Sequence, residues 1–350
     1  MKKRVLSGIR ATGRLHLGNY LGAVKGMLEL QNDPDYETLY MVADVHTLTT
    51  PYKKEELQKN RREVIIDYLA AGLDPEKSIL FQQSEVNSHL ELAFYFSSVV
   101  TIAKMQHLPT FKDKVKQYPE HATMALLNYP ILMSADILVY KAGLVPVGID
   151  QEPHLEVSRE IARRMNQDFG TDFPEPKRFA TKGEYVPSLT GEGKMSKTVE
   201  GSFINLTDDL ETIRKKVAKI PTDSGKGNID EFQKAPMNPE KVEKYEVAHT
   251  TTQKGTATIF EFVELFLGKE KRASYEKMYL DQNSPALRYG EIKSEISEAI
   301  YTELAPLQEK RKELEANSDY VDTVIKEGNE KARMIATATC KEVREKMGLS

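Results

Sequence analysis

The sequence predicts an α/β protein with a doubly wound, parallel (Rossmann-like) sheet and a C-terminal all-helical domain. Up to about residue 206, short apolar runs alternate with segments of helical period, an order typical of parallel sheets. Beyond that point only helical periodicity appears. The chain has 350 residues, of which 40% are hydrophobic, so it can bury more than one core.

Four segments are predicted to be strands. They are residues 4–9, 38–43, 78–83 and 144–148. The second is almost wholly apolar, as expected of a strand buried on both faces of a parallel sheet. Helices are predicted over 13–31 and 53–72, and a helical insertion over about 89–140. Such sheets bind nucleotides at the carboxyl ends of their strands, which is where the motifs below fall.

The C-terminal part is predicted to be helical over five segments. These are residues 210–220, 240–252, 257–268, 286–317 and 318–347. The domain organisation expected from this is a catalytic domain over 1–206, with a mobile loop at 191–200, and a helical domain over 207–350. The last helix is a candidate to pack back on the catalytic domain.

Composition excludes several classes of protein. The net charge is −4 with 29% charged residues, which argues against a strongly basic DNA-coating protein. The single cysteine, Cys340, allows no internal disulfide and no cysteine-rich site, so neither structural zinc nor another metal site is expected. The N-terminus lacks the apolar run of a signal peptide, and no segment is long enough to cross a bilayer. We therefore expect a cytoplasmic protein with no membrane partner.

The first chemical motif spans residues 7–20, where a strand enters a glycine-bearing loop and a helix follows. Glycine lets a base or phosphate approach the backbone, and a helix start offers unpaired N–H groups. His16 and Asn19 can donate hydrogen bonds to phosphate oxygens, where charge grows as pyrophosphate leaves. The alternative is a simple helix start with a surface histidine.

Two further motifs are loops. Residues 191–198 place Lys194 and Lys197 around a serine in a glycine-rich segment that could close over a triphosphate, or could be a solvated loop. At residues 145–154 a strand runs out into Gly148-Ile149-Asp150-Gln151. Asp150 could accept hydrogen bonds from ribose hydroxyls or cap the following helix.

The fourth motif is an apolar segment, 129–140, with a lone carboxylate. If it is helical, Met133, Asp136 and Tyr140 share one face. A buried carboxylate needs a partner, because leaving it unpaired costs on the order of several kcal/mol. The partner is either a ligand N–H or hydroxyl, or a group of the protein itself.

In this order and at these separations, the four segments resemble the class I aminoacyl-tRNA synthetases. HLGN at 16–19 is similar to the family's HIGH motif, and KMSKT at 194–198 to its KMSKS motif. Within class I, the resemblance is to the tryptophan-specific family. It is carried by residues 7–23, 43–49, 132–140, 145–166 and 222–224, and it thins past about residue 230.

The resemblance implies ATP-dependent activation of L-tryptophan to tryptophanyl-adenylate and its transfer to tRNA(Trp) for protein synthesis. It further implies a homodimer, magnesium carried with ATP, and a helical domain that reads the anticodon. The residues implied for catalysis are His16, Asn19, Lys194, Ser196 and Lys197. Those implied for ATP are Arg10, Ala11, Thr12, Gly18, Asn19, Gly148, Ile149, Asp150, Val186, Lys194, Met195, Ser196, Lys197 and Thr198. Those implied for tryptophan are Asp136, Met133, His46, Gln151, Leu6 and Gly8.

The chain departs from the family pattern at several of these positions. Many bacterial members have Gln-Pro-Ser where this chain has residues 10–12, Phe at Leu6, Glu at Ile149 and Ser at Thr198. These changes concern the ATP contacts and the wall around the indole, and Arg10 could contact a phosphate or a carboxylate.

Three alternatives remain beside the tryptophan enzyme. A tyrosyl-tRNA synthetase shares the fold and loops, but LMSADILVY and GIDQ favour tryptophan. A nucleotidyltransferase that does not use tRNA is disfavoured by KMSKT and by the long helical region. A non-catalytic paralogue that binds RNA or a protein is disfavoured by the intact HLGN and KMSKT motifs.

Overall fold

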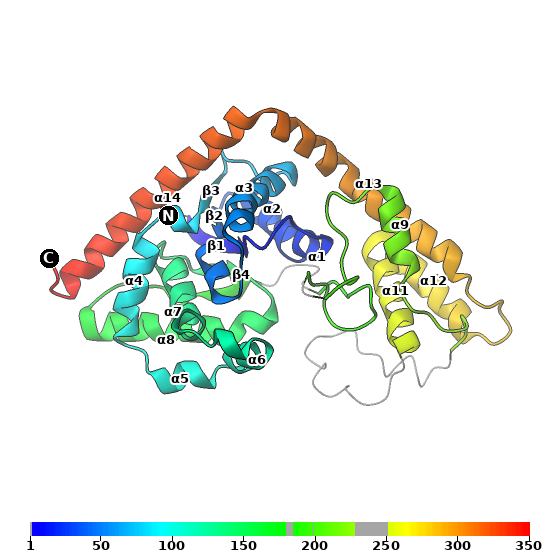
Figure 1. The fold of residues 1–350 in the computed structure, drawn as a ribbon, viewed down its shortest axis with the longest axis horizontal. Coiled ribbons are helices and arrows are strands. Elements are labelled where there is room, and N and C mark those ends of the chain that lie inside the picture. Colours follow the sequence, from blue (N-terminus) through cyan, green and yellow to red (C-terminus); the bar gives the residue numbers. More distant parts are fainter. Residues whose placement is uncertain (1, 180–184, 198, 228–250) are drawn as a thin grey trace. The chain divides into compact units, whose positions relative to one another are not determined.

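The structure, a computed structural model, describes residues 2–179, 185–197, 199–227 and 251–350 (Figure 1). Contacts divide the chain into two compact units. The first comprises Met1–Arg14, Ala23–Glu184 and Lys310–Ser350, and the second comprises Leu15–Gly22 and Tyr185–Glu309. This division differs from the boundary expected between residues 206 and 207. That boundary concerns the functional roles of the two parts, and it stays a prediction.

The first unit contains a five-stranded, wholly parallel sheet in the order β3-β2-β1-β4-β5. The strands are β1 Lys3–Arg10, β2 Tyr36–Ala43, β3 Ser78–Gln82, β4 Leu144–Pro146 and β5 Lys177–Phe179. The order reverses between β1 and β4, which is the switch point where such sheets bind ligands. The predicted parallel Rossmann-like sheet is confirmed, and the four predicted strands lie within about two residues of their expected bounds. The short β5 was not predicted, because Lys-Arg-Phe forms no apolar run.

Alternation along β2 separates the two faces of this sheet. Leu39 and Met41 join the large core that also contains residues of the helices after β3. Tyr40 points the other way, and its hydroxyl donates to the carbonyl of Met27 at 2.7 Å. Both faces are therefore covered by helices, which explains why the strand reads as a continuous apolar run.

The helices of the first unit follow the strands in the expected alternation (Figure 1). They are α2 Lys25–Gln31, α3 Lys54–Ala70, α4 Ser88–Ser97, α5 Ile102–His107, α6 Pro109–Gln117, α7 Met124–Leu138, α8 Glu152–Phe169 and α14 Ser318–Lys346. Helices α4 to α7 occupy the segment expected to hold a helical insertion. Helix α8 ends at Gly170, whose φ of 68° is the left-handed conformation that glycine adopts most easily.

Helix α14 packs against β3, the edge strand of the sheet. Oδ1 of Asn329 accepts a hydrogen bond from the backbone N–H of Gln82 at 2.8 Å. A Cβ on Gly328 would lie 1.7 Å from the carbonyl oxygen of Leu80, so the helix can approach the strand only with glycine there. The edge of the sheet is thereby covered, which protects it from pairing with another chain.

Where the structure describes it, the second unit is helical apart from its loops. It contains α1 Leu17–Asn19, α9 Leu210–Ala218, α11 Thr251–Leu267, α12 Lys269–Leu280 and most of α13 Tyr289–Ala316. The predicted helix over 13–31 is interrupted, because a π-helical turn, Tyr20–Val24, joins α1 to α2. Helix α12 was not predicted, and most of the helix expected over 240–252 lies outside the described residues. Within the described part of the chain, no helix is long and apolar enough to cross a membrane.

Candidate active site

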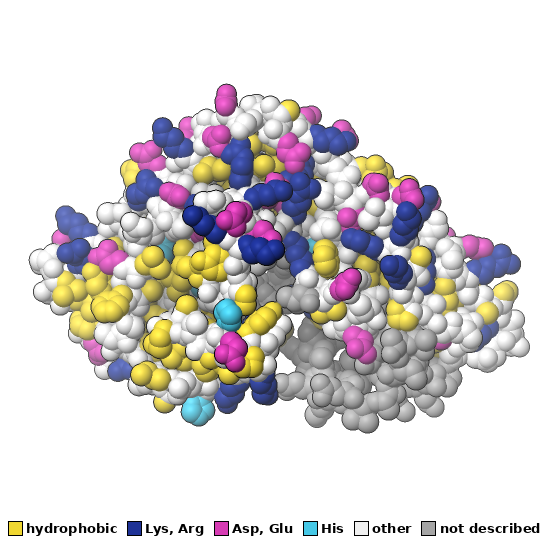
Figure 2. Space-filling view, in the orientation of Figure 1, with side chains coloured by type: hydrophobic (Ala, Val, Ile, Leu, Met, Phe, Trp, Pro, Cys, Tyr) yellow, Lys and Arg dark blue, Asp and Glu magenta, His cyan; other side chains and the backbone are white. Residues whose placement is uncertain are grey.

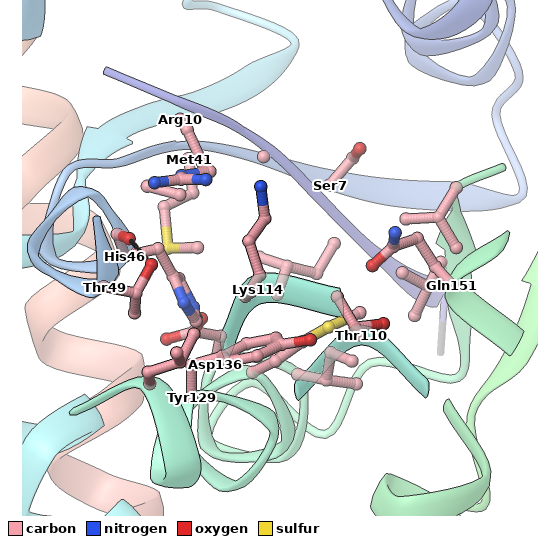
Figure 3. A pocket seen from close by; sticks show the side chains of 18 residues that line it. Ser7, Arg10, Met41, His46, Thr49, Thr110, Lys114, Tyr129, Asp136 and Gln151 are labelled. Atoms are coloured by element: carbon pink, nitrogen blue, oxygen red, sulfur yellow. Dashed lines mark hydrogen bonds and ion pairs between the residues drawn. The ribbon is translucent and has the colours of Figure 1, made fainter. Parts of the chain in front are cut away.

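A cavity of about 400 Å³ opens in the first unit at the carboxyl ends of β1 and β2, next to β4 and α7 (Figure 3). Its size lies within the range usual for sites that bind small molecules. The lining includes all six residues predicted to hold the amino acid, which are Leu6, Gly8, His46, Met133, Asp136 and Gln151. They come from four segments far apart in the sequence, and the fold brings them together.

The carboxylate of Asp136 is buried at one end of this cavity, with 2% of the residue exposed. Nε2 of His46 lies 2.8 Å from Oδ2, and Nδ1 of His89 lies 2.6 Å from Oδ1. The side-chain amide of Gln83 donates to Oδ1 at 2.8 Å. Groups of the protein therefore donate hydrogen bonds to this carboxylate, which was one of the two alternatives that the sequence left open. Since a carboxylate can accept about four hydrogen bonds, room for one more donor remains.

The charge on Asp136 determines the tautomers around it. Burial raises the pKa of this carboxyl, but the hydrogen bonds and charges of His46 and His89 outweigh burial and lower it to about 2. An ionised carboxylate only accepts, so both histidine nitrogens donate to it. When His89 is neutral, its Nε2 accepts from the hydroxyl of Tyr140, which lies 2.8 Å away. Tyr140 does not line the cavity, and it lies beyond Leu138, where α7 ends.

Two cationic side chains also line the cavity, and only one of them was singled out from the sequence. Arg10 lies at the end of β1, and its Nη2 donates to Oγ1 of Thr50 at 2.9 Å. Lys114, on α6, was missed, although the run Phe-Lys-Asp-Lys places two lysines on a short helix. Figure 3 shows the ammonium of Lys114 directed into the space near Arg10. Thr110 and Tyr129 also line the cavity and were not predicted.

The Gly148–Gln151 segment forms a short turn between β4 and α8. Asp150 accepts a hydrogen bond from the side-chain amide of its neighbour Gln151 at 2.6 Å. No side chain among the described residues forms a capping hydrogen bond at the start of α8. The interpretation of Asp150 as a helix cap is therefore wrong. Ile149 and Asp150 are exposed, which leaves both accessible to a ligand.

The second unit carries the HLGN motif at the start of α1. His16 and Asn19 form a reciprocal cap. Nδ1 of His16 accepts from the backbone N–H of Asn19 at 3.3 Å, and Oδ1 of Asn19 accepts from the backbone N–H of His16 at 3.2 Å. The histidine is 7% exposed, so it is a buried capping residue and not a surface histidine.

The protonation state of His16 follows from its surroundings. Burial, followed by the charges of Lys197 and Lys194, lowers its pKa to about 4. The imidazole is therefore neutral near pH 7. Because Nδ1 already accepts a hydrogen bond, the proton resides on Nε2, which is a donor. The side-chain amide of Asn19 likewise keeps N–H donors, since its oxygen is the atom used in the cap.

The KMSK loop lies in the same unit as HLGN. Lys194 forms an isolated bridge with Pro187, and the backbone N–H of Met195 donates to the carbonyl of Val186 at 2.8 Å. Met195 is buried, and a Cβ on Gly18 would lie 3.3 Å from its Cβ and 2.9 Å from Cε1 of His16. Gly18 thus lets the two motifs pack closely. The prediction for Thr198 concerns a residue outside the described part of the chain.

The residues predicted for ATP therefore fall into two sets. In the first unit lie Arg10, Ala11, Thr12, Gly148, Ile149 and Asp150. In the second lie Gly18, Asn19, Val186, Lys194, Met195, Ser196 and Lys197. Ala11 is buried and Thr12 exposed, and the N–H of Thr12 donates to the carbonyl of Arg10 at 2.9 Å.

Comparison with known proteins gives consistent matches over the chain. Residues 1–305 match the model of the family described as tRNA synthetases class I (W and Y). The chain is 36% identical over 347 residues to a tryptophan–tRNA ligase of Porphyromonas gingivalis, with 98% of each chain covered. It is 38% identical to the Fusobacterium nucleatum enzyme of that name, covering 99% of this chain and 98% of the relative. The structure resembles a tryptophanyl-tRNA synthetase of Campylobacter jejuni complexed with ADP and tryptophan (TM-score 0.79, 29% identity, 99% and 100% covered).

Proposed function

The chain belongs to the class I tRNA synthetases of the tryptophan and tyrosine family, and we propose that it activates L-tryptophan with ATP and transfers it to tRNA(Trp). The observation that carries the choice of amino acid is the buried carboxylate of Asp136 in a cavity lined by all six expected residues. The names of the relatives support tryptophan over the tyrosine alternative.

The cavity suits an indole because one acidic group stands among apolar walls. Leu6, Met133 and Val145 contribute apolar lining, and Asp136 keeps one acceptor position. The indole N–H would take that position. Phenylalanine offers no such donor and would leave the acceptor unpaired, which is how a buried polar group rejects an analogue that lacks the matching hydrogen bond.

The reaction proceeds by positioning and charge stabilisation. The carboxylate of tryptophan attacks the α-phosphorus of ATP, the new O–P bond forms, and the bond to pyrophosphate breaks. Nε2–H of His16 and the amide of Asn19 donate to phosphate oxygens, while Lys194 and Lys197 offset the charge that develops on the leaving group. A hydroxyl of the terminal ribose at the 3′ end of tRNA then attacks the adenylate carbonyl and displaces AMP.

Magnesium enters this proposal with ATP and not as a resident metal. Among the described residues, no group of three or more His, Cys, Asp or Glu side chains is arranged to hold a metal ion. The phosphates of ATP are ligands that Mg²⁺ commonly uses, together with water. The ion would shield the triphosphate, and residues of the KMSK loop would supply the remaining positive charge.

A homodimer is supported by an exposed apolar face of the first unit. Five large apolar side chains on this face are between 44% and 77% exposed, namely Leu48, Leu90, Phe94, Ile102 and Met124. Leu48, Leu90 and Phe94 also line a groove of about 340 Å³ formed by α4, α7 and the turn after β2. Figure 2 shows hydrophobic side chains gathered over this part of the first unit. Such a patch is typical of a protein–protein interface, and a second copy of the chain is the proposed occupant.

The groove adjoins the amino-acid cavity, since Thr49 and Tyr129 line both. The walls that face the substrate thus back directly onto the proposed interface.

The thiol of Cys340 is buried, and burial raises its pKa to about 12, as expected of an unreactive cysteine. A reduced cysteine and tRNA as a substrate support a cytoplasmic location.

The experiment that tests the function is amino-acid-dependent exchange of pyrophosphate into ATP, with tryptophan, tyrosine and phenylalanine in parallel. Exchange with tryptophan alone, followed by charging of tRNA(Trp), is the expected result. Exchange with tyrosine would contradict the role of Asp136. No exchange with any of the three would contradict the activity itself.

A further inference from the structure

Arg10 holds an unused hydrogen-bond donor inside the amino-acid cavity. Its Nη2 donates to Thr50, but Nε is buried and has no hydrogen-bond partner among the described residues. A buried donor without a partner costs roughly 1–3 kcal/mol, so such a group usually meets a ligand or water. The side chain lines the cavity directly, and Thr50 holds the guanidinium from one side.

The charge of Arg10 has no carboxylate partner among the residues that the structure describes. Within the described part of the chain, neither Arg10 nor Lys114 forms an ion pair with a carboxylate, although both line the cavity. Nζ of Lys114 instead donates to the side-chain amide of Gln117 at 2.8 Å. Burial lowers the pKa of both cations, and that of Lys114 is lowered further by Arg10. Two half-buried cations side by side favour an anion between them.

We infer that Arg10 binds the α-carboxylate of the amino acid and so makes a free carboxylate a condition of binding, an assignment that rests on the proposed function. Asp136 and Arg10 line one cavity, and Figure 3 shows them apart from each other, with His46 between them in this view. The first offers an acceptor and the second offers donors with a positive charge. A single ligand with an N–H at one end and a carboxylate at the other satisfies both.

Guanidinium suits this role better than a neutral amide side chain would. Its planar fork matches the two oxygens of a carboxylate, and it stays charged at any working pH. The competing anion is the α-phosphate of ATP, which approaches the same carboxylate during the reaction. Binding measured without ATP separates the two.

The test measures equilibrium binding of tryptophan and of tryptamine, which lacks the carboxylate, by calorimetry in the absence of ATP. Arg10→Gln keeps a hydrogen-bonding side chain but removes the charge, and it should weaken tryptophan binding about tenfold or more. Tryptamine binding should stay within about twofold. Arg10→Lys should recover part of the loss. Arg14→Gln is the matched control, because Arg14 lies outside the cavity lining and pairs with Glu63 and Glu315.

The outcomes separate this inference from the proposed function. If the wild-type protein exchanges pyrophosphate with tryptophan but Arg10→Gln binds tryptophan normally, the inference is wrong and the function stands. Equal losses for tryptophan and tryptamine would show a structural role for Arg10. Unchanged tryptophan binding with weaker ATP binding would assign the side chain to a phosphate. A wild-type protein without tryptophan exchange would overturn the function first.

Discussion

Nε2 of His46 lies 2.8 Å from Oδ2 of Asp136, and the pair joins the turn after β2 to the last turn of α7. The ionised carboxylate makes His46 a donor, so the tautomer of this histidine is determined by its partner. This contact therefore positions both the carboxylate that accepts from the substrate and the histidine beside it in the cavity wall. The pair is the natural starting point for mutagenesis.

Asp136→Asn and Asp136→Ala are expected to weaken the selection of tryptophan. The carboxylate is replaced by a weaker acceptor or by none, so kcat/KM for tryptophan should fall at least tenfold and approach the values for tyrosine and phenylalanine. Pyrophosphate exchange with the three amino acids measures this. Asp67→Asn is the control, because Asp67 is also buried but pairs with Arg311 away from the cavity. Unchanged discrimination in both Asp136 variants would rule out the assignment.

Lys194→Ala and Lys197→Ala should slow activation without weakening tryptophan binding. Each lysine is proposed to act on charge that exists only as pyrophosphate leaves, so kcat should fall about a hundredfold or more. Single-turnover adenylate formation and calorimetric tryptophan binding separate the two effects. Lys215→Ala, at an exposed lysine of α9 paired with Glu211, should leave both unchanged. Weaker tryptophan binding in the loop variants would contradict the proposed division of roles.

The stability of the protein should depend on His16 at mildly acidic pH. Its pKa is about 4 when folded and about 6.5 when unfolded, so the unfolded chain binds more protons between these values. The contribution of neutral His16 is thus complete above pH 6.5 and is lost as the pH falls towards 4, by at most about 3 kcal/mol. Urea unfolding of wild type and His16→Asn, which retains a capping side chain, should show a difference in stability that shrinks over this range. A difference independent of pH would show that His16 does not titrate there.

Gly328→Ala should destabilise the first unit. The new Cβ would lie 1.7 Å from the carbonyl oxygen of Leu80, so α14 must move away from β3. Overpacking of this kind costs about 1–3 kcal/mol or more. Denaturant unfolding measures the loss. Gly143→Ala is the control in the same unit, because a Cβ there meets nothing within 4 Å and should change stability by no more than about 0.5 kcal/mol. Equal effects of the two substitutions would contradict the close packing of α14.

Phe94→Asp should dissociate the proposed dimer. Phe94 is 77% exposed on the apolar face, and a charge there would be buried unpaired when two copies meet. Sedimentation velocity over a range of concentrations should show monomer for this variant and dimer for wild type. Met334→Asp, at a methionine of α14 that is 69% exposed and lies outside the groove, should remain dimeric. A wild-type protein that is monomeric at all concentrations would contradict the proposed homodimer.

Much of the fold could be predicted because its signals are local. The run 38–43 is apolar throughout since both faces of β2 are covered, and periodicity marked α3, α13 and α14. The π-helical turn at Tyr20–Val24 could not be predicted, because it changes the hydrogen bonding without breaking the helical period. Helix α12 was missed because its sequence is highly charged and shows little apolar periodicity.

Within the site, prediction succeeded for residues embedded in motifs and failed for those outside them. Asp136 stood out as a lone carboxylate in an apolar segment, and it lines the cavity as expected. His89, Gln83 and Lys114 were not singled out, since none of them lies in one of the four motifs. They became visible only as the neighbours of Asp136 and Arg10.

The sequence alone determined the fold class, the chemical motifs and the family, because strands, glycine loops and paired lysines are written in short stretches of chain. Only the tertiary structure decided the charge and partners of each group. It placed His46, His89 and Gln83 around one carboxylate, left Nε of Arg10 without a partner among the described residues, and buried His16 so that it stays neutral. Burial and hydrogen bonding depend on which segments meet in space, and that is a property of the folded chain as a whole.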